Sequence, residues 1–182
     1  MASGAEIWFA PDGTPVTIRA IGADDLDLER EFVNGLSRAT GYQRLMSART
    51  PSLEELRRFT DIDPARETAL IALTATNGRE REIGVARYVR DENSAGEAEF
   101  AIVLADDWQR RGLGRKLLAS LIDDAKRHGV RRLVGTTLSH NEGMLRLVRR
   151  LGFSLALDPA SASITNIALD LAQMRQDVGK PG

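Results

Sequence analysis

Three consecutive strand-like runs constrain the fold of this chain more than any other feature of its sequence. Residues 68–76, 81–89 and 97–104 are rich in apolar and β-branched side chains, and only short turn sequences separate them. Strands joined so closely pair most simply as an antiparallel meander. A segment with helical apolar spacing, residues 112–128, follows the third run. The core is therefore expected to form between a sheet and the helices packed on it.

The segments before the meander predict further elements of the same domain. Residues 16–21 alternate between apolar and polar side chains, as a half-buried strand does. A helix capped by Asp24 or Asp25 should follow this strand. A second helix is expected to begin at a capping box made by Ser52 and Glu55.

The second half of the chain continues the alternation of strands and helices. Gly129 closes the long helix, and the later elements are expected as a strand at 131–138, a helix at 141–151 and strands at 153–157 and 164–171. Residues 41–50 form either a loop or a short helix. The order predicts one mixed α/β domain (α+β) over residues 16–171, with a mostly antiparallel sheet and helices on both faces. Residues 1–15 and 172–182 are expected to form an N-terminal and a C-terminal tail.

Composition excludes several classes of function. The 182 residues suffice for one domain with a sizeable core and fall short of two. A net charge of −1, from 25 basic and 26 acidic residues, argues against a nucleic-acid-binding protein. Without cysteine, and with His128 and His140 as its two histidines, the chain offers no thiolate or His-rich metal site. No apolar run is long enough to span a membrane, and the first residues lack the pattern of a signal peptide, so a cytoplasmic protein without membrane contact is expected.

Positive charge and glycine meet at the start of the long helix, in the stretch QRRGLGRK (residues 109–116). A helix N-terminus exposes amide N–H groups without intrahelical partners and carries partial positive charge. Gly112 and Gly114 lack Cβ atoms, so an anion can approach this backbone closely. These features predict a phosphate or pyrophosphate site; the alternative is a solvated basic helix start with glycines that only turn the chain. The dinucleotide fingerprint and the P-loop sequence are both absent.

The same stretch resembles the cofactor loop of a known enzyme family. QRRGLG, placed between a strand and a helix, resembles the Q/R-x-x-G-x-G/A signature of the GNAT superfamily of N-acetyltransferases. The resemblance implies acetyl-CoA as co-substrate, no metal, and central strands that splay apart. The strand before the loop would meet the pantetheine arm chiefly through its main chain, at Ile102, Val103 and Leu104. The loop would line the pyrophosphate with Gln109, Arg110, Arg111, Gly112, Leu113, Gly114 and Arg115.

Residues near the end of the predicted domain resemble the same family. The stretch LSHNEGMLRLVRRLGF (residues 138–153) is similar to the family's fifth-strand exit and following helix. Asn141 stands where an asparagine of the family commonly contacts the cofactor. A plain helix N-cap is the other explanation for this asparagine, and both roles can coexist. Family members are often dimers, so the resemblance also implies a homodimer.

Glu99 is the catalytic base that the resemblance supports. An attacking amine must be neutral, whereas a lysine amine, with a pKa of about 10.4, is almost wholly protonated at neutral pH. Glu99 lies in an otherwise apolar strand, where we expect a partly dry setting suited to a base. The alternative is a surface residue held in an ion pair. Glu97 shares its face and is expected to be solvated, and backbone N–H groups around Leu104 would stabilise the oxyanion.

One position departs from the family's pattern. In the last helix of the domain many members carry a tyrosine that protonates the departing thiolate, and Val148 stands at the corresponding position. The two tyrosines of the chain, Tyr42 and Tyr88, lie elsewhere in the sequence. The thiolate is then expected to take its proton from water, or with help from Ser139 or His140.

The first half narrows the likeness to one subfamily and bears on the acceptor. Residues 16–37, 53–73 and 98–118 look like the acetyltransferase domain of bacterial protein lysine acetyltransferases, which modify the active-site lysine of acyl-CoA synthetases. A protein lysine is therefore the expected acceptor. A small amine, such as a polyamine, an amino acid or an aminoglycoside, is the alternative on the same scaffold. A third alternative, motivated by the missing tyrosine, is an acyl-CoA-binding sensor without catalysis; the presence of Glu99 weighs against it.

Overall fold

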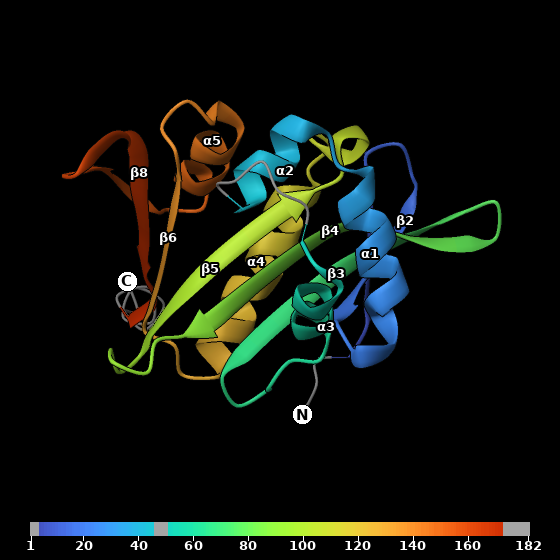
Figure 1. Ribbon diagram of the computed structural model, residues 1–182, viewed down its shortest axis with the longest axis horizontal. Coiled ribbons are helices and arrows are strands. Elements are labelled where there is room, and N and C mark those ends of the chain that lie inside the picture. Colours follow the sequence, from blue (N-terminus) through green and yellow to red (C-terminus); the bar gives the residue numbers. More distant parts are fainter. Residues whose placement is uncertain (1–3, 46–50, 173–182) are drawn as a thin grey trace, which may run out of the picture.

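An eight-stranded sheet runs through the whole molecule in the computed structural model, which describes residues 4–45 and 51–172 (Figure 1). The strands are β1 (Glu6–Phe9), β2 (Pro15–Ala20), β3 (Glu67–Thr76), β4 (Arg79–Arg90), β5 (Glu97–Leu104), β6 (Arg132–Leu138), β7 (Ser154–Asp158) and β8 (Ser161–Asp170). Their order in the sheet is β1-β2-β3-β4-β5-β6-β8-β7. Neighbouring strands are antiparallel except β5 and β6, which are parallel.

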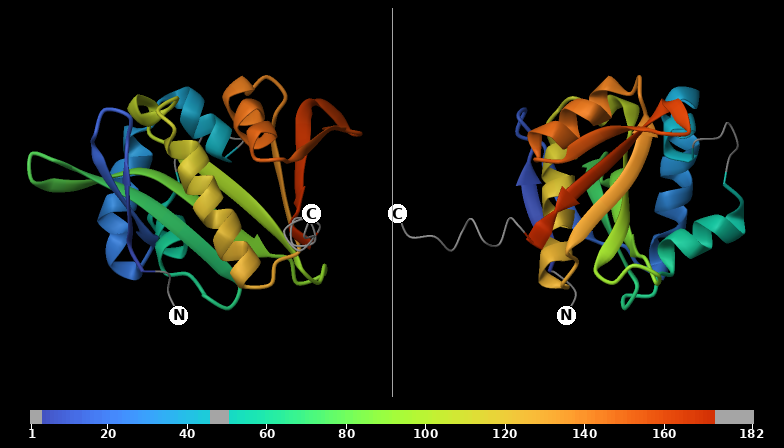
Figure 2. Two further views of the ribbon diagram at one scale, coloured as in Figure 1. Left: turned by 180° about the vertical axis from the view of Figure 1, so that it is seen from behind. Right: turned by 90° about the vertical axis from the view of Figure 1, so that its left-hand side faces the viewer.

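Helices cover both faces of this sheet. They are α1 (Leu26–Gly35), α2 (Arg38–Leu45), α3 (Leu53–Thr60), α4 (Leu113–Arg127) and α5 (Glu142–Arg150), with 3-10 turns η1 (Ala23–Asp25) and η2 (Asp106–Trp108). Figure 1 shows α1 and α3 in front of the sheet and α4 behind it, and Figure 2 shows the same layers from behind and from the side. α4 packs on β3, β4 and β5, while α1 contacts β4 and α2 contacts β5. The predicted fold class, a mixed and mostly antiparallel sheet between helices, is confirmed.

Local signals for helix ends were read correctly in several places. The Ser52 side chain accepts a hydrogen bond from the Glu55 N–H, and the Glu55 carboxylate accepts one from the Ser52 N–H, as a capping box requires. Gly129 and Gly152 follow α4 and α5 with φ of 77° and 86°, the left-handed conformation of a C-terminal glycine. Asp25 precedes α1, but its carboxylate binds Arg19 and the Gly22 N–H instead of the helix.

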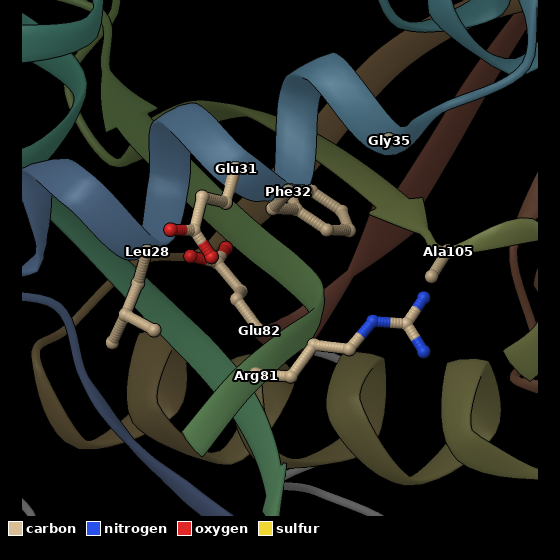
Figure 3. Close-up of a pocket in the computed structure, with 7 residues that line it drawn as sticks. All are labelled: Leu28, Glu31, Phe32, Gly35, Arg81, Glu82 and Ala105. Carbon is tan, nitrogen blue, oxygen red and sulfur yellow. The ribbon is translucent and has the colours of Figure 1, made fainter. Parts of the chain in front are cut away.

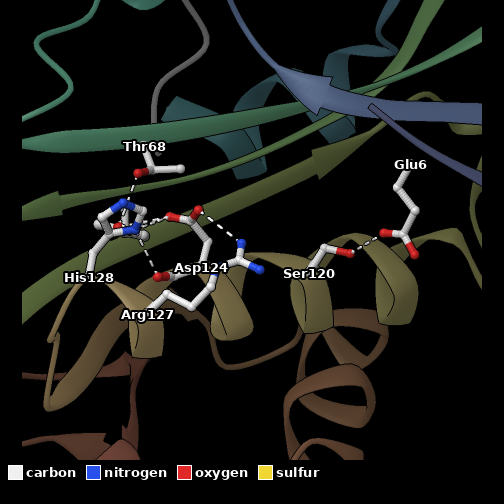
Figure 4. Close-up of polar contacts among 7 residues, drawn as sticks. Glu6, Thr68, Ser120, Asp124, Arg127 and His128 are labelled. Carbon is white, nitrogen blue, oxygen red and sulfur yellow. Dashed lines mark hydrogen bonds and ion pairs between the residues drawn. The ribbon is translucent and has the colours of Figure 1, made fainter. Parts of the chain in front are cut away.

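A buried polar network joins the sheet to the C-terminal half of α4. Tyr88 donates its hydroxyl to Asp124 Oδ1 (3.0 Å) and accepts a hydrogen bond from Thr68 (3.0 Å). Arg127 and His128 contact the same Asp124 side chain from one turn further along the helix, as Figure 4 shows. Burial raises the pKa of Tyr88, so its hydroxyl stays protonated and donates a hydrogen bond to this carboxylate.

One segment differs from the sequence-based expectation, and a second decides an alternative that the sequence left open. The predicted N-terminal tail contains β1, which pairs with β2 from Glu6 opposite Ile18 to Phe9 opposite Pro15. The alternative left open for residues 41–50 is decided in favour of helix as far as Leu45; residues 46–50, like 173–182 of the C-terminal tail, lie outside the described residues. None of the helices in the described part of the chain is long and apolar enough to cross a membrane.

Candidate functional site

The sheet opens between β5 and β6. The two strands pair over three positions, from Glu97 with Arg132 to Glu99 with Val134, and then part. β6 pairs with β8 along its whole length, and Figure 1 shows β5 and β6 diverging beyond the paired positions. Within the described residues, β5 therefore has no strand partner on its β6 side beyond Glu99. Its amide and carbonyl groups on that side can pair with an extended ligand.

The three residues predicted to meet a pantetheine arm lie on this open part of β5. On the other side of the strand, Ile102, Val103 and Leu104 pair with β4. Val103 is buried, whereas Ile102 and Leu104 are half-buried and pack against the core. The opening thus presents backbone more than polar side chains. Their contact with a cofactor stays a prediction.

Two residues of the loop between β5 and α4 have left-handed backbone conformations. Arg110 and Gly112 both have positive φ, 60° and 88°. A left-handed conformation is costly for a residue with a Cβ atom, and glycine at position 112 avoids that cost. Because α4 begins at Leu113, the N–H groups of its first turn have no carbonyl one turn earlier. The side chain of Leu113 is buried, and Gly114 is buried as well. At these two positions a ligand could therefore contact only the main chain.

The cationic side chains of the loop fall into two groups. Those of Arg110 and Arg115 are exposed. Arg111 and Lys116 are half-buried, and each forms an ion pair with an acidic residue of the N-terminal segment. The Arg111 guanidinium also lies 4.2 Å from the centre of the Trp108 ring. The backbone N–H groups and the two exposed arginines therefore provide most of the capacity of this loop to bind an anion.

Residues near the start of the chain contribute to this loop, although no pattern in the sequence predicted their contact with it. Asp12 and Glu6 supply the two ion pairs, and Glu6 also accepts a hydrogen bond from Ser120 Oγ (3.3 Å), as drawn in Figure 4. The Trp8 ring lies beside Gly112, where an added Cβ atom would come within 3.7 Å of it. A local sequence pattern does not predict these contacts, because the paired residues lie 99 and 110 positions apart in the sequence.

A polar network joins the loop to the N-terminus of α2. The Asp106 carboxylate accepts hydrogen bonds from the Ser37 N–H (2.9 Å), from Ser37 Oγ (2.7 Å) and from Thr40 Oγ1 (2.7 Å). Burial raises the pKa of Asp106, but these hydrogen bonds outweigh it and hold the pKa below its usual range. Gln109 Nε2 donates to Thr40 Oγ1 (3.2 Å) and to the Leu104 carbonyl (3.4 Å). The side-chain amide of Gln109, predicted at the pyrophosphate, is thus engaged by the protein itself.

Glu99 lies where β5 and β6 part, but its environment differs from the expectation. Its side chain is exposed, so the expected partly dry setting is wrong. The physical reason is that this face of the sheet is uncovered here: Val89, directly opposite on β4, is 40% exposed. Glu97, expected to be solvated, is half-buried and accepts a hydrogen bond from Arg132 (3.2 Å). The alternative for Glu99 was a surface residue held in an ion pair; on this strand it is Glu97 that forms such a pair, with Arg132.

The side chain of Glu99 points to the face that carries α3. Alternate residues of a strand share a face, so Glu99 and Ala101 lie on the same side of β5. Arg87, opposite Ala101, donates a hydrogen bond to the Phe59 carbonyl of α3 (2.8 Å). An acceptor that reaches Glu99 would therefore approach from the side of α2 and α3.

Asn141 has the structural role that was weighed beside its cofactor role. Its Oδ1 accepts a hydrogen bond from the Met144 N–H (3.2 Å), which caps α5, and its Nδ2 donates to Thr137 Oγ1 (3.3 Å). The N-cap is confirmed, and contact with the cofactor stays a prediction.

The position of the family's tyrosine offers no proton donor. Val148 is completely buried in the core. Ser139 Oγ shares a hydrogen bond with Thr165 Oγ1 (2.9 Å), and His140 is exposed. Water, Ser139 and His140 remain the predicted proton sources for the thiolate.

A small pocket lies apart from these residues, between α1 and β4. Figure 3 shows its lining, which contains none of the predicted site residues: Leu28, Glu31, Phe32, Gly35, Arg81, Glu82 and Ala105. At the β5–β6 opening, in contrast, strand backbone is unpaired beyond the exposed Glu99, and the N-terminus of α4 follows the end of the same strand. The described residues contain no group of three or more histidine or acidic side chains that could hold a metal ion.

Comparison with known proteins identifies the family. Residues 16–154 match the family model described as an acetyltransferase (GNAT) domain. Acetyltransferase PA5475 of Pseudomonas aeruginosa is 36% identical over 151 residues, which cover 81% of this chain and 80% of that protein. Acetyltransferase Pat of Mycolicibacterium smegmatis is 34% identical over 129 residues, which cover 69% of this chain but only 38% of that longer protein.

The fold is similar to that of the same family. The crystal structure of the GNAT domain of S. lividans PAT superposes with a TM-score of 0.81 at 25% identity, covering 92% of this chain and 97% of that domain. The splayed β5 and β6 and the loop before α4 lie within the matched region. The chain belongs to the GNAT family of acetyltransferases, enzymes that take their acetyl group from acetyl-CoA.

Proposed function

We propose that this acetyltransferase transfers the acetyl group to a lysine side chain of a protein, such as the active-site lysine of an acyl-CoA synthetase. The observation that carries the proposal is the exposed Glu99 at the point where β5 and β6 part. A lysine side chain is long enough to bring its amine to such a carboxylate from the surface of a folded protein. The resemblance of residues 16–37, 53–73 and 98–118 to bacterial protein lysine acetyltransferases supports the same choice.

The geometry of the loop fits the phosphates of acetyl-CoA. Gly112 adopts a left-handed backbone without strain, and the N–H groups of the first turn of α4 that follows it have no intrahelical partners and can bind an anion. The exposed Arg110 and Arg115 add positive charge nearby. The pantetheine arm would then follow the unpaired edge of β5 toward Glu99, with its amide groups hydrogen-bonded to the strand backbone.

The chemistry divides between a side chain and the backbone. Glu99 accepts a proton from the acceptor amine, whose nitrogen attacks the thioester carbonyl carbon; the C–N bond forms and the C–S bond breaks. Backbone N–H groups around Leu104 stabilise the oxyanion. Because Val148 provides no proton, the sulfur leaves as thiolate and takes its proton from water, which yields the amide and coenzyme A thiol.

A thiol-release assay tests the acceptor. An acyl-CoA synthetase is compared with a panel of polyamines, amino acids and aminoglycosides at one acetyl-CoA concentration, and mass spectrometry locates the new amide. We expect release with the synthetase, abolished when its active-site lysine is replaced by arginine. Turnover with a small amine alone would contradict the protein acceptor. Acetyl-CoA binding without turnover on any acceptor would contradict catalysis as well.

A further inference from the structure

The side chains of α2 that the structure describes bury little apolar surface against the rest of the protein. Its sequence is RATGYQRL, and of its side chains that the structure describes, Thr40 is the buried one, with 6% of its surface exposed. A helix of eight residues is marginal in water without tertiary contacts. The order of α2 therefore depends strongly on its polar contacts with the rest of the protein.

Thr40 makes the contacts that link α2 to the β5 side of the cofactor loop. Its hydroxyl donates to Asp106 Oδ1 (2.7 Å), just after β5, and accepts a hydrogen bond from Gln109 Nε2 (3.2 Å), directly before Arg110. A hydroxyl is able to donate and accept at once, whereas a methyl group in its place does neither. Gln109 is further held by the Leu104 carbonyl. Thr40 is thus joined to two residues of the segment that connects β5 to α4.

Ser37 caps the helix and contacts the loop at Asp106. Its hydroxyl accepts a hydrogen bond from the Thr40 N–H (3.2 Å) and donates to Asp106 Oδ1 (2.7 Å), so it caps α2. It has no contact with Gln109 among those that the described residues make. The capping of α2 and the link to Gln109 therefore reside in two different side chains.

We propose that Thr40 is a positioning residue that couples acetyl-CoA binding at the loop to the order of α2 on the acceptor side of the sheet. The proposal rests on the proposed function for the place where acetyl-CoA binds and for the side of the sheet that the acceptor approaches. A ligand that immobilises the loop fixes Asp106 and Gln109, and through Thr40 it fixes α2, which packs on β5 beside the approach to Glu99. By thermodynamic linkage, an acceptor that orders α2 strengthens acetyl-CoA binding by the same factor. The acetyl donor then prepares the acceptor side before the acceptor arrives.

Amide hydrogen exchange of α2, with and without acetyl-CoA, tests the coupling. In the unaltered protein, saturating acetyl-CoA should slow exchange over residues 38–45 by about 5-fold or more, a typical coupling factor. The Thr40→Val variant should bind acetyl-CoA, as measured by calorimetry, but lose this slowing at its own saturating concentration. The Thr40→Ser variant keeps the hydroxyl and should restore it.

The Ser37→Ala variant is the matched control. It should speed α2 exchange in both states because the cap is weakened, yet keep the acetyl-CoA-dependent slowing because the Thr40 link is intact. Thermal unfolding of each variant shows whether the fold is preserved. Equal slowing in Thr40→Val and in the unaltered protein, or none in either despite acetyl-CoA binding, would overturn the coupling while leaving the proposed function intact. Failure of acetyl-CoA to bind at all would instead overturn the proposed function, and the coupling with it.

Discussion

The exposed carboxylate of Glu99 leads to a prediction about rate and pH. Replacing it by glutamine should lower kcat/KM at neutral pH by about 100-fold or more, the usual contribution of a general base. The deficit should shrink as pH rises toward the lysine pKa of about 10.4, because the amine then loses its proton to solvent. Steady-state thiol release from pH 6 to 10 measures both effects.

Glu97→Gln is the matched control for Glu99. It removes the same charge from the same face of β5, two residues away, but at a side chain held by Arg132. We expect its kcat/KM to stay within about 3-fold of the unaltered value, as a residue outside the reaction should. A Glu99→Gln variant as active as this control at pH 7 would remove Glu99 from the role of base.

The contrast between Glu97 and Glu99 shows which properties of a single residue the sequence predicts and which it does not. Alternation along β5 correctly placed Glu97 and Glu99 on one face. It did not reveal that Arg132, from a strand 35 residues further on, engages Glu97 and leaves Glu99 exposed. The motif likewise located Gln109 but not its contact with Thr40. Long-range partners of polar side chains are set by tertiary packing, which a local pattern does not contain.

At the scale of one helix, the two ends of α4 provide a matched test of the loop. Gly112 and Gly129 both have left-handed backbone, with φ of 88° and 77°, so valine at either position costs about 1–2 kcal/mol of stability. Only Gly112 lies at the proposed phosphate site. Gly112→Val should therefore raise the Kd for acetyl-CoA by about 10-fold or more, the loss of roughly one charge-assisted hydrogen bond, whereas Gly129→Val should leave it unchanged. Calorimetric titration of both variants, with unfolding curves beside them, measures this, and equal Kd values would contradict the loop assignment.

Elements with a strong periodic pattern were predicted, and those held by distant contacts were not. The meander β3–β4–β5 and the helix α4 follow directly from alternating and helical apolar spacing. β1 is only four residues long, and with Pro11, Gly13 and Pro15 after it the segment resembles a turn; it becomes a strand because β2 offers it an edge. α2 is polar and short, and it depends on Asp106 from another part of the chain.

For the molecule as a whole, acid stability should depend on the ion pair that ties β2 to the start of α1. The hydrogen bonds from Arg19, above all, lower the pKa of Asp25, and the Gly22 N–H adds to this effect. A lowered folded-state pKa stabilises the protein above the unfolded value of about 3.9, and this stabilisation is lost as pH falls through the lower folded value. Asp25→Asn should therefore cost about 2 kcal/mol at pH 7, and its difference from the unaltered protein should narrow below pH 4. Urea unfolding from pH 7 to 3 measures this; the exposed Asp24→Asn is the control, and a constant difference across the range would contradict the assignment.

Two ion pairs tie the start of the chain to the loop at Arg111 and to α4 at Lys116, and they place two carboxylates beside the proposed phosphate site. They therefore test how charges far apart in the sequence set the affinity of this site for an anion. Ion pairs at the protein surface stabilise little, about 0–1 kcal/mol each, and both carboxylates here are exposed while their cations are half-buried. Their loss should therefore not loosen the loop, beside which Trp8 still lies. Their loss does, however, release the charges of Arg111 and Lys116 toward the pyrophosphate. The Glu6→Gln, Asp12→Asn double variant should therefore bind acetyl-CoA about 2- to 5-fold more tightly at low salt, and the gain should vanish near 1 M salt, where charges are screened beyond about 3 Å.

The matched control for that double variant removes two carboxylates from exposed ion pairs elsewhere. Asp27→Asn with Glu92→Gln breaks pairs with Arg30 and Arg66, at the first turn of α1 and in the β4–β5 turn. Net charge changes by the same amount, so any general attraction of the anion is matched, and affinity should stay close to that of the unaltered protein. Weaker binding in the Glu6, Asp12 variant alone would show that the N-terminal carboxylates hold the loop in shape and do not compete for its cations. The change in acetyl-CoA affinity has opposite signs in the two cases. One titration at two salt concentrations therefore shows whether these carboxylates compete with the ligand or organise its site.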